Sequence, residues 1–148
     1  MEFNKYFTFE ELTTSSDHKE LVPRNQEDAI EYATIGKKLS NLLGQIREIL
    51  GNKPIRVTSG FRNEFLNKAV GSMAKSSAHL RFAAADIITS NMSVEDAFKV
   101  IHTNRYKLPD LKKCIIEKNT WIHVEVKMTT EEPQQFFTSK DGIHFSIV

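Results

Sequence analysis

Two spacings of apolar residues along the chain predict a mixture of helices and strands. A spacing of three to four predicts one long core-packing helix over residues 25–50, and it is shown by Ala29, Ala33, Ile35, Leu39, Leu42, Leu43, Ile46 and Leu50. Asn25 is a suitable N-cap for this helix, and Gly51 follows where a glycine commonly ends one. Residues 1–25, which precede it, are expected to be irregular apart from one helical turn.

Alternating and short apolar runs predict the strands, which lie in the remaining two thirds of the chain. Expected strands cover residues 54–58, 83–88, 113–117 and 120–127, followed by a hairpin of 136–138 and 143–148 around Asp141-Gly142. Capping signals add a helical turn after Thr8 and short helices after Asn63 and Ser93. The expected fold is α+β, a small antiparallel sheet packed with helices, in a single domain of residues 1–148.

Within residues 120–127 the alternation separates two faces. Ile122, Val124 and Val126 point one way, and Trp121, His123 and Glu125 point the other. An apolar face is expected to pack on the core, and the second face is then open to carry chemistry.

Composition excludes several classes of function. The 148 residues are 40% hydrophobic and 26% charged, with a net charge of +1 and no dense Lys/Arg run, so nucleic acid is not expected as a partner. Membrane insertion is not expected either, because neither a signal pattern at the N-terminus nor an apolar run of about 20 residues occurs. The single cysteine, Cys114, lies in an apolar run and is interpreted as a core residue.

His79, Asp86 and His123 are the candidate metal ligands. Two imidazoles and one carboxylate would leave the fourth position of a tetrahedral zinc ion open, which is typical of catalytic sites. Spacing alone leaves the alternative that these are ordinary core or surface histidines.

Four segments favour the metal site over ordinary histidines, and they read FTFEEL, PIRVTSGFRNEFLNKAVGS, SSAHLRFAAADI and IIEKNTWIHVEV. Over residues 7–127 the chain resembles the zinc peptidases of the M15 family, the D-alanyl-D-alanine carboxypeptidase and phage-endolysin group with the hedgehog/DD-peptidase fold. The resemblance implies Zn²⁺ on the three candidate ligands. It also implies that Arg62 binds a substrate carboxylate or the scissile carbonyl, that Ser77 hydrogen-bonds near the substrate, and that Trp121 is a pocket wall or a core residue.

Two positions depart from the family pattern. Many members carry an acidic residue three positions before the last histidine, where this chain has Thr120. Glu117 matches the glutamate of one subgroup and is the expected general base, with Glu125 in reserve and the absence of an effective base as the remaining alternative. Phe82 stands where glycine is usual. Because phenylalanine does not readily take a positive φ, the loop between His79 and Asp86 is expected to differ in shape from that of other members or to narrow the pocket.

The resemblance implies a zinc-dependent peptidase that hydrolyses peptidoglycan stem peptides, as a carboxypeptidase or an endopeptidase. Such a protein would be made in the cytoplasm and act on the cell wall after release in phage lysis, or as part of a virion with other virion proteins as partners. The alternative is a catalytically weak or inactive virion or cell-wall-binding protein that keeps the fold, and a third reading is a structural-zinc scaffold. His18 and His102 have no motif support, and His144 is a minor outside candidate for a ligand.

Overall fold

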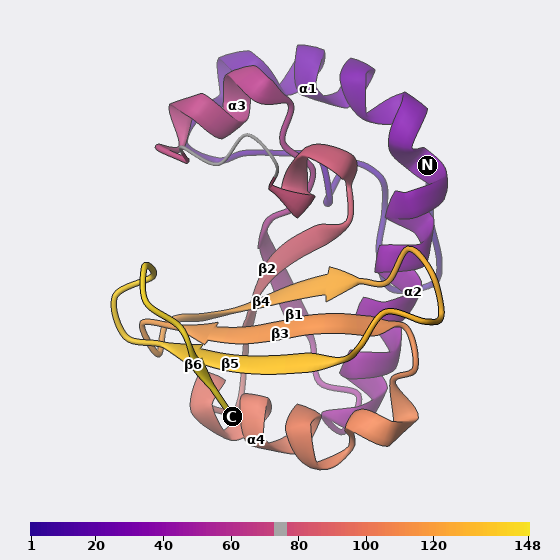
Figure 1. Cartoon of the computed structure of the whole chain (residues 1–148). Coiled ribbons are helices and arrows are strands. Elements are labelled where there is room, and N and C mark those ends of the chain that lie inside the picture. Colours follow the sequence, from indigo (N-terminus) through magenta and orange to yellow (C-terminus); the bar gives the residue numbers. More distant parts are fainter. Residues whose placement is uncertain (73–76) are drawn as a thin grey trace.

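The computed structural model describes residues 1–72 and 77–148, which form a six-stranded sheet packed with helices (Figure 1). The strands are β1 (Ile55–Ser59), β2 (Ala84–Thr89), β3 (Leu111–Glu117), β4 (Trp121–Val126), β5 (Gln135–Ser139) and β6 (Ser146–Ile147). The α-helices are α1 (Val22–Ala29), α2 (Ala33–Ile49), α3 (Glu64–Ala69) and α4 (Val94–Thr103). Short 3-10 helices are η1 (Lys19–Leu21), η2 (Ile30–Tyr32), η3 (Ala78–Arg81) and η4 (Arg105–Lys107). The α+β class is confirmed, and the loop predicted at 72–77 lies mostly outside the described residues.

The strand order is β1-β2-β4-β3-β5-β6, and the sheet is mixed rather than wholly antiparallel as predicted. β3 and β5 pair in parallel because the chain leaves β4 beside the start of β3, where the Lys127 N–H donates to the Asp110 carbonyl at 2.8 Å. The chain then crosses to the side of β3 that faces away from β4, where β5 runs in the same direction as β3. The predicted tail hairpin is confirmed as the antiparallel pair β5–β6.

The two faces of β4 divide the molecule as the alternation predicts. Ile122, Val124 and Val126 are buried, and α2 and α4 contact the sheet on this side. The opposite face carries Trp121, His123 and Glu125, which are only partly covered. Among the helices of the described residues, none combines the length and the apolar character needed to cross a bilayer.

The long helix predicted over residues 25–50 is wrong in its first part. The 3-10 turn η2 separates α1 from α2, and in Figure 1 the two helices run in different directions. Asn25 does not cap a helix but lies inside α1, where its side chain is fully buried. Its amide donates to the carbonyls of Thr13 and Phe61 at 2.8 and 3.0 Å and accepts from the Asn63 N–H at 2.7 Å. The side-chain amide of Asn25 is therefore engaged in hydrogen bonds with distant residues and does not cap the helix.

The other capping predictions are confirmed. Thr8 and Glu11 form a reciprocal capping box, Asn63 accepts from the Leu66 N–H, and Ser93 accepts from the Asp96 N–H. Cys114 is completely buried, as expected of a core residue.

The prediction that Phe82 would avoid a left-handed backbone is wrong. Phe82 ends η3 with φ 64° and ψ 25°, and its ring is fully buried. The ring packs against Phe3, Phe9 and Phe61 with centroids 5.4–6.3 Å apart. Aromatic packing thus offsets the cost of the strained backbone, and because the ring faces the core it does not narrow the cavity on the other face of the sheet.

Candidate metal centre

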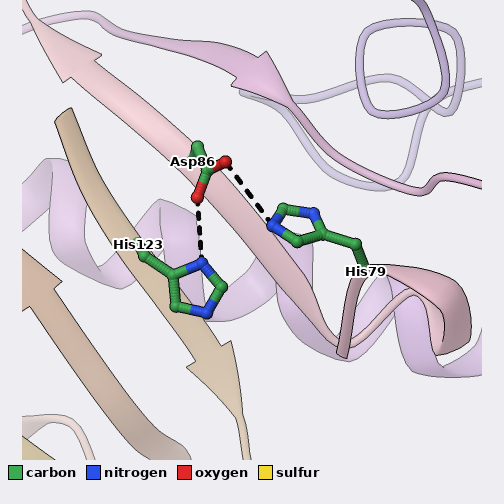
Figure 2. A group of neighbouring side chains, drawn as sticks. All are labelled: His79, Asp86 and His123. Carbon is green, nitrogen blue, oxygen red and sulfur yellow. Dashed lines mark hydrogen bonds and ion pairs between the residues drawn. The ribbon is translucent and has the colours of Figure 1, made fainter. Parts of the chain in front are cut away.

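The three candidate ligands lie together, with one possible ligand atom from each within 4.8 Å of the others. Asp86 on β2 and His123 on β4 are direct cross-strand partners, so both side chains point to the same face of the sheet. His79 comes from η3, immediately before β2. Figure 2 shows the Asp86 carboxylate between the two rings, with Oδ2 at 3.5 Å from His79 Nε2 and Oδ1 at 2.9 Å from His123 Nδ1.

A backbone carbonyl fixes the orientation of the His79 ring. Nδ1 lies 2.7 Å from the Gly60 carbonyl oxygen, and since a carbonyl only accepts, Nδ1 donates to it and Nε2, which faces Asp86, is the nitrogen that could bind a metal. Gly60 is needed here, because a Cβ at this position would lie 2.2 Å from the Leu12 carbonyl oxygen. The glycine of the Ser-Gly-Phe-Arg turn therefore supports a ligand, a role that the sequence analysis missed.

His123 lies between two carboxylates. Its Nε2 is 2.7 Å from Glu125 Oε2, while Nδ1 faces Asp86. Burial alone would lower the pKa of His123, but hydrogen bonds to Asp86 and Glu125 raise it to about 10. Burial would likewise raise the pKa of Asp86, but the charges of His79 and His123 and their hydrogen bonds hold it well below its usual range.

This donor set fits zinc. Two imidazole nitrogens and a carboxylate oxygen converge from three sides, and each imidazole has a hydrogen-bond acceptor at its other nitrogen. The assignment of these residues as metal ligands stays a prediction.

Arg62 follows the turn after β1 and lies beside the centre. Its backbone N–H donates to the His79 carbonyl at 3.1 Å, and Nη1 of its side chain donates to Ser59 Oγ at 3.2 Å. Burial lowers the pKa of Arg62, and the nearby charges of Asp86 and Glu117 oppose that shift. Its Nε is buried without a hydrogen-bond partner among the described residues. Such a donor is costly to leave unpaired, so it fits a carbonyl or carboxylate supplied by a ligand.

Glu117 faces the same region from the end of β3. It lines a cavity of about 350 Å³ together with His123, Glu125 and Lys113, and the apolar part of the wall consists of Ile115, Phe137 and Phe145. Trp121, its cross-strand partner, donates from Nε1 to Glu117 Oε2 at 2.8 Å. Burial raises the pKa of Glu117, and the charge of Asp86 adds to this, while His123 opposes it. A carboxyl with a raised pKa at a cavity wall is well suited to accept a proton.

The remaining predicted site residues have contacts that define their local roles. Trp121 positions Glu117, and Ser77 Oγ accepts from the His79 N–H at 3.3 Å, which caps η3. The carboxylate of Glu125 is hydrogen-bonded to His123, which favours Glu117 over Glu125 as the base. Thr120 is exposed and donates to the Lys118 carbonyl, so it takes no part. Contacts of Ser77 or Trp121 with a substrate stay predictions.

The other histidines have partners of their own within the described residues. His144 pairs with Asp141 at 2.6 Å, His102 packs edge-on against Phe136, and His18 lies 3.8 Å from Glu20. The group that could hold a metal in residues 1–72 and 77–148 consists of His79, Asp86 and His123. The minor candidacy of His144 therefore finds no support.

An α+β fold that presents two histidines and an aspartate close to a partly buried arginine, with one of the histidines and a glutamate lining a cavity, has the arrangement of a metal-dependent hydrolase. The sequence model described as Peptidase M15 matches residues 5–125, and the chain belongs to this family, which confirms the resemblance. The family implies a metallopeptidase and is generally zinc-dependent. A search of curated proteins gives no significant match.

Proposed function

We propose that the protein is a zinc-dependent peptidase that hydrolyses the stem peptides of peptidoglycan. The observation that carries the proposal is the convergence of His79, Asp86 and His123 beside a cavity lined by Glu117, in a chain of the M15 family. The family supports a peptide substrate, and peptidoglycan is the substrate class that the resemblance implies. The proposed place of action is the cell wall, reached after release in phage lysis or from a virion.

Zinc held by these three residues would lower the pKa of a coordinated water towards about 7 and polarise the scissile carbonyl. Glu117 then takes the proton of the attacking water. Its Oε2 is held by Trp121, and Oε1 makes no hydrogen bond with the described residues, so Oε1 is the proton acceptor. After attack, the same carboxyl returns the proton to the leaving amine.

Arg62 binds an oxygen of the substrate. Its Nε–H is buried and has no hydrogen-bond partner among residues 1–72 and 77–148, and Nη1 donates to Ser59 Oγ. A fixed guanidinium donor stabilises the carbonyl oxygen as negative charge develops on it, or anchors the terminal carboxylate of a carboxypeptidase substrate. The apolar wall of Ile115, Phe137 and Phe145 covers the substrate side chain beside the scissile bond.

The test is hydrolysis of purified sacculi and of a synthetic stem pentapeptide by the zinc-loaded protein, with products identified by mass spectrometry. The masses show whether D-Ala-D-Ala, L-Ala-D-Glu or a cross-link is cut. Wild type should release products, and Glu117→Gln should lower kcat by roughly 10²–10⁴-fold without loss of bound zinc. Glu48→Gln is the matched control, because Glu48 is exposed on α2, which packs on the other side of the sheet.

Two results would overturn the proposal. One is hydrolysis that survives both Glu117→Gln and His123→Ala. The other is a wild-type protein that binds one zinc ion but cleaves neither substrate, which would favour a virion or cell-wall-binding protein that keeps the fold.

A further inference from the structure

Glu125 has a contact that the proposed reaction does not use. It stands two residues after His123 on β4, so the two side chains share one face of the strand, and each is only 13% exposed. Oε2 of Glu125 lies 2.7 Å from Nε2 of His123, on the opposite edge of the ring from Asp86. Each ring nitrogen of His123 therefore has a carboxylate oxygen within hydrogen-bond distance.

This contact determines which nitrogen of His123 can bind a metal. An ionised carboxylate only accepts hydrogen bonds, so the proton of this pair resides on Nε2. Nδ1 is then the nitrogen that offers a lone pair when Asp86 binds the same ion. His79 is arranged in the opposite sense, since its Nδ1 donates to the Gly60 carbonyl and Nε2 faces Asp86.

We propose that Glu125 is a positioning residue of the metal centre, which holds His123 as an Nδ1 ligand and thereby sets the affinity for zinc. The inference rests on the proposed zinc site and concerns a residue two positions beyond the last ligand. A carboxylate partner both orients an imidazole ligand and raises its basicity, and removal of such partners lowers metal affinity by about 10–100-fold. Glu117 makes no such contact and serves the substrate side of the centre.

Glu125 as the general base is the competing role. To serve as base it would have to leave His123, and the ring would lose its partner at Nε2. The two roles differ in what a substitution changes. If Glu125 were the base, its substitution would leave the zinc affinity unchanged and lower turnover. If Glu125 positions His123, its substitution lowers the zinc affinity of the protein even without substrate.

The experiment measures the Kd for Zn²⁺ by competition with a chromophoric chelator at one fixed pH, using the full chain. Glu125→Ala should raise Kd by about 10–100-fold. Glu125→Gln should fall between Ala and wild type, because the amide oxygen still accepts from Nε2–H but carries no charge. Glu48→Gln is the control and should match wild type. The visible spectrum of the Co²⁺-loaded protein should change in Glu125→Ala and not in this control.

The outcomes separate this inference from the proposed function. A Kd for Glu125→Ala within about threefold of wild type, with an unchanged Co²⁺ spectrum, overturns the inference alone. If the alanine variant does not fold, the glutamine variant decides, and an affinity equal to wild type overturns it. If Glu125→Ala weakens zinc binding as expected but the wild-type protein cleaves neither substrate, the proposed function is overturned and the inference is supported. A wild type that binds no zinc overturns both.

Discussion

The contact between Phe82 and Gly36 allows a quantitative test of how the core accommodates a large side chain at the end of η3. A Cβ built at Gly36, inside α2, would lie 2.7 Å from the nearest atom of the Phe82 ring, and its three nearest neighbours all belong to that ring. We therefore expect Gly36→Ala to be harmful only while Phe82 is present.

The magnitudes follow from two opposing terms. Alanine in place of glycine inside a helix gains about 1 kcal/mol, and forcing a methyl group into a packed core costs about 1–3 kcal/mol. In wild type, Gly36→Ala should therefore lower the free energy of unfolding by about 0–2 kcal/mol. In a Phe82→Ala background the clash is absent, and the same change should raise the free energy of unfolding by about 1 kcal/mol. The coupling energy of the double-mutant cycle should be about 1–3 kcal/mol.

Urea unfolding of the four zinc-free proteins, followed by the fluorescence of Trp121, the single tryptophan, measures this cycle. Phe82→Ala itself should cost about 3–5 kcal/mol, so Phe82→Leu is the substitute if the alanine variant is too unstable to analyse. Equal effects of Gly36→Ala in both backgrounds, within about 0.5 kcal/mol, would refute the reasoning.

Three further predictions concern the site and its support. Asn25→Ala should lower the free energy of unfolding by about 2–4 kcal/mol in urea titrations, because it leaves buried carbonyl and N–H groups without partners. The zinc-free protein should be most stable between about pH 4 and 6.5. Below pH 4 the contribution of Asp86, whose pKa is lowered from 3.8, is lost, and from pH 6.5 towards 10 the contribution of His123 is lost, as urea midpoints across pH should show. Phe145→Ala should raise KM for the stem pentapeptide several-fold with little change in kcat or zinc affinity, since it removes part of the cavity wall and Phe145 is not one of the proposed ligands.

Each of these has a control within the chain. Glu48→Gln should leave all three measurements unchanged. His123→Gln should flatten the loss of stability above pH 6.5, and a wild-type profile in that variant would contradict the assigned cause. An Asn25→Ala protein as stable as wild type, or a Phe145→Ala protein that loses kcat rather than KM, would contradict the corresponding contact.

The candidate site shows where reasoning from the sequence succeeds. The ligand types, the strand face of His123 and the turn before Arg62 follow from local patterns and from the resemblance, because a strand alternates with period two and a Ser-Gly turn ends a strand. The sequence places Glu117 ahead of Glu125 as the base only through the resemblance to a family subgroup. The contacts that separate their roles, the hydrogen bonds to Trp121 and His123, come from the tertiary structure.

The sequence by itself determines the α+β class, the caps at Thr8, Asn63 and Ser93, and the buried face of β4, because these depend on residues a few positions apart. Tertiary structure alone decides that β2 lies beside β4, which makes Asp86 and His123 neighbours, and that β5 runs parallel to β3. It also decides that Asn25 joins distant carbonyls rather than capping a helix, and that Gly36 makes room for Phe82. The physical reason is the same throughout: a hydrogen bond or a packing contact between distant residues depends on strand order and helix placement, which the whole core sets together.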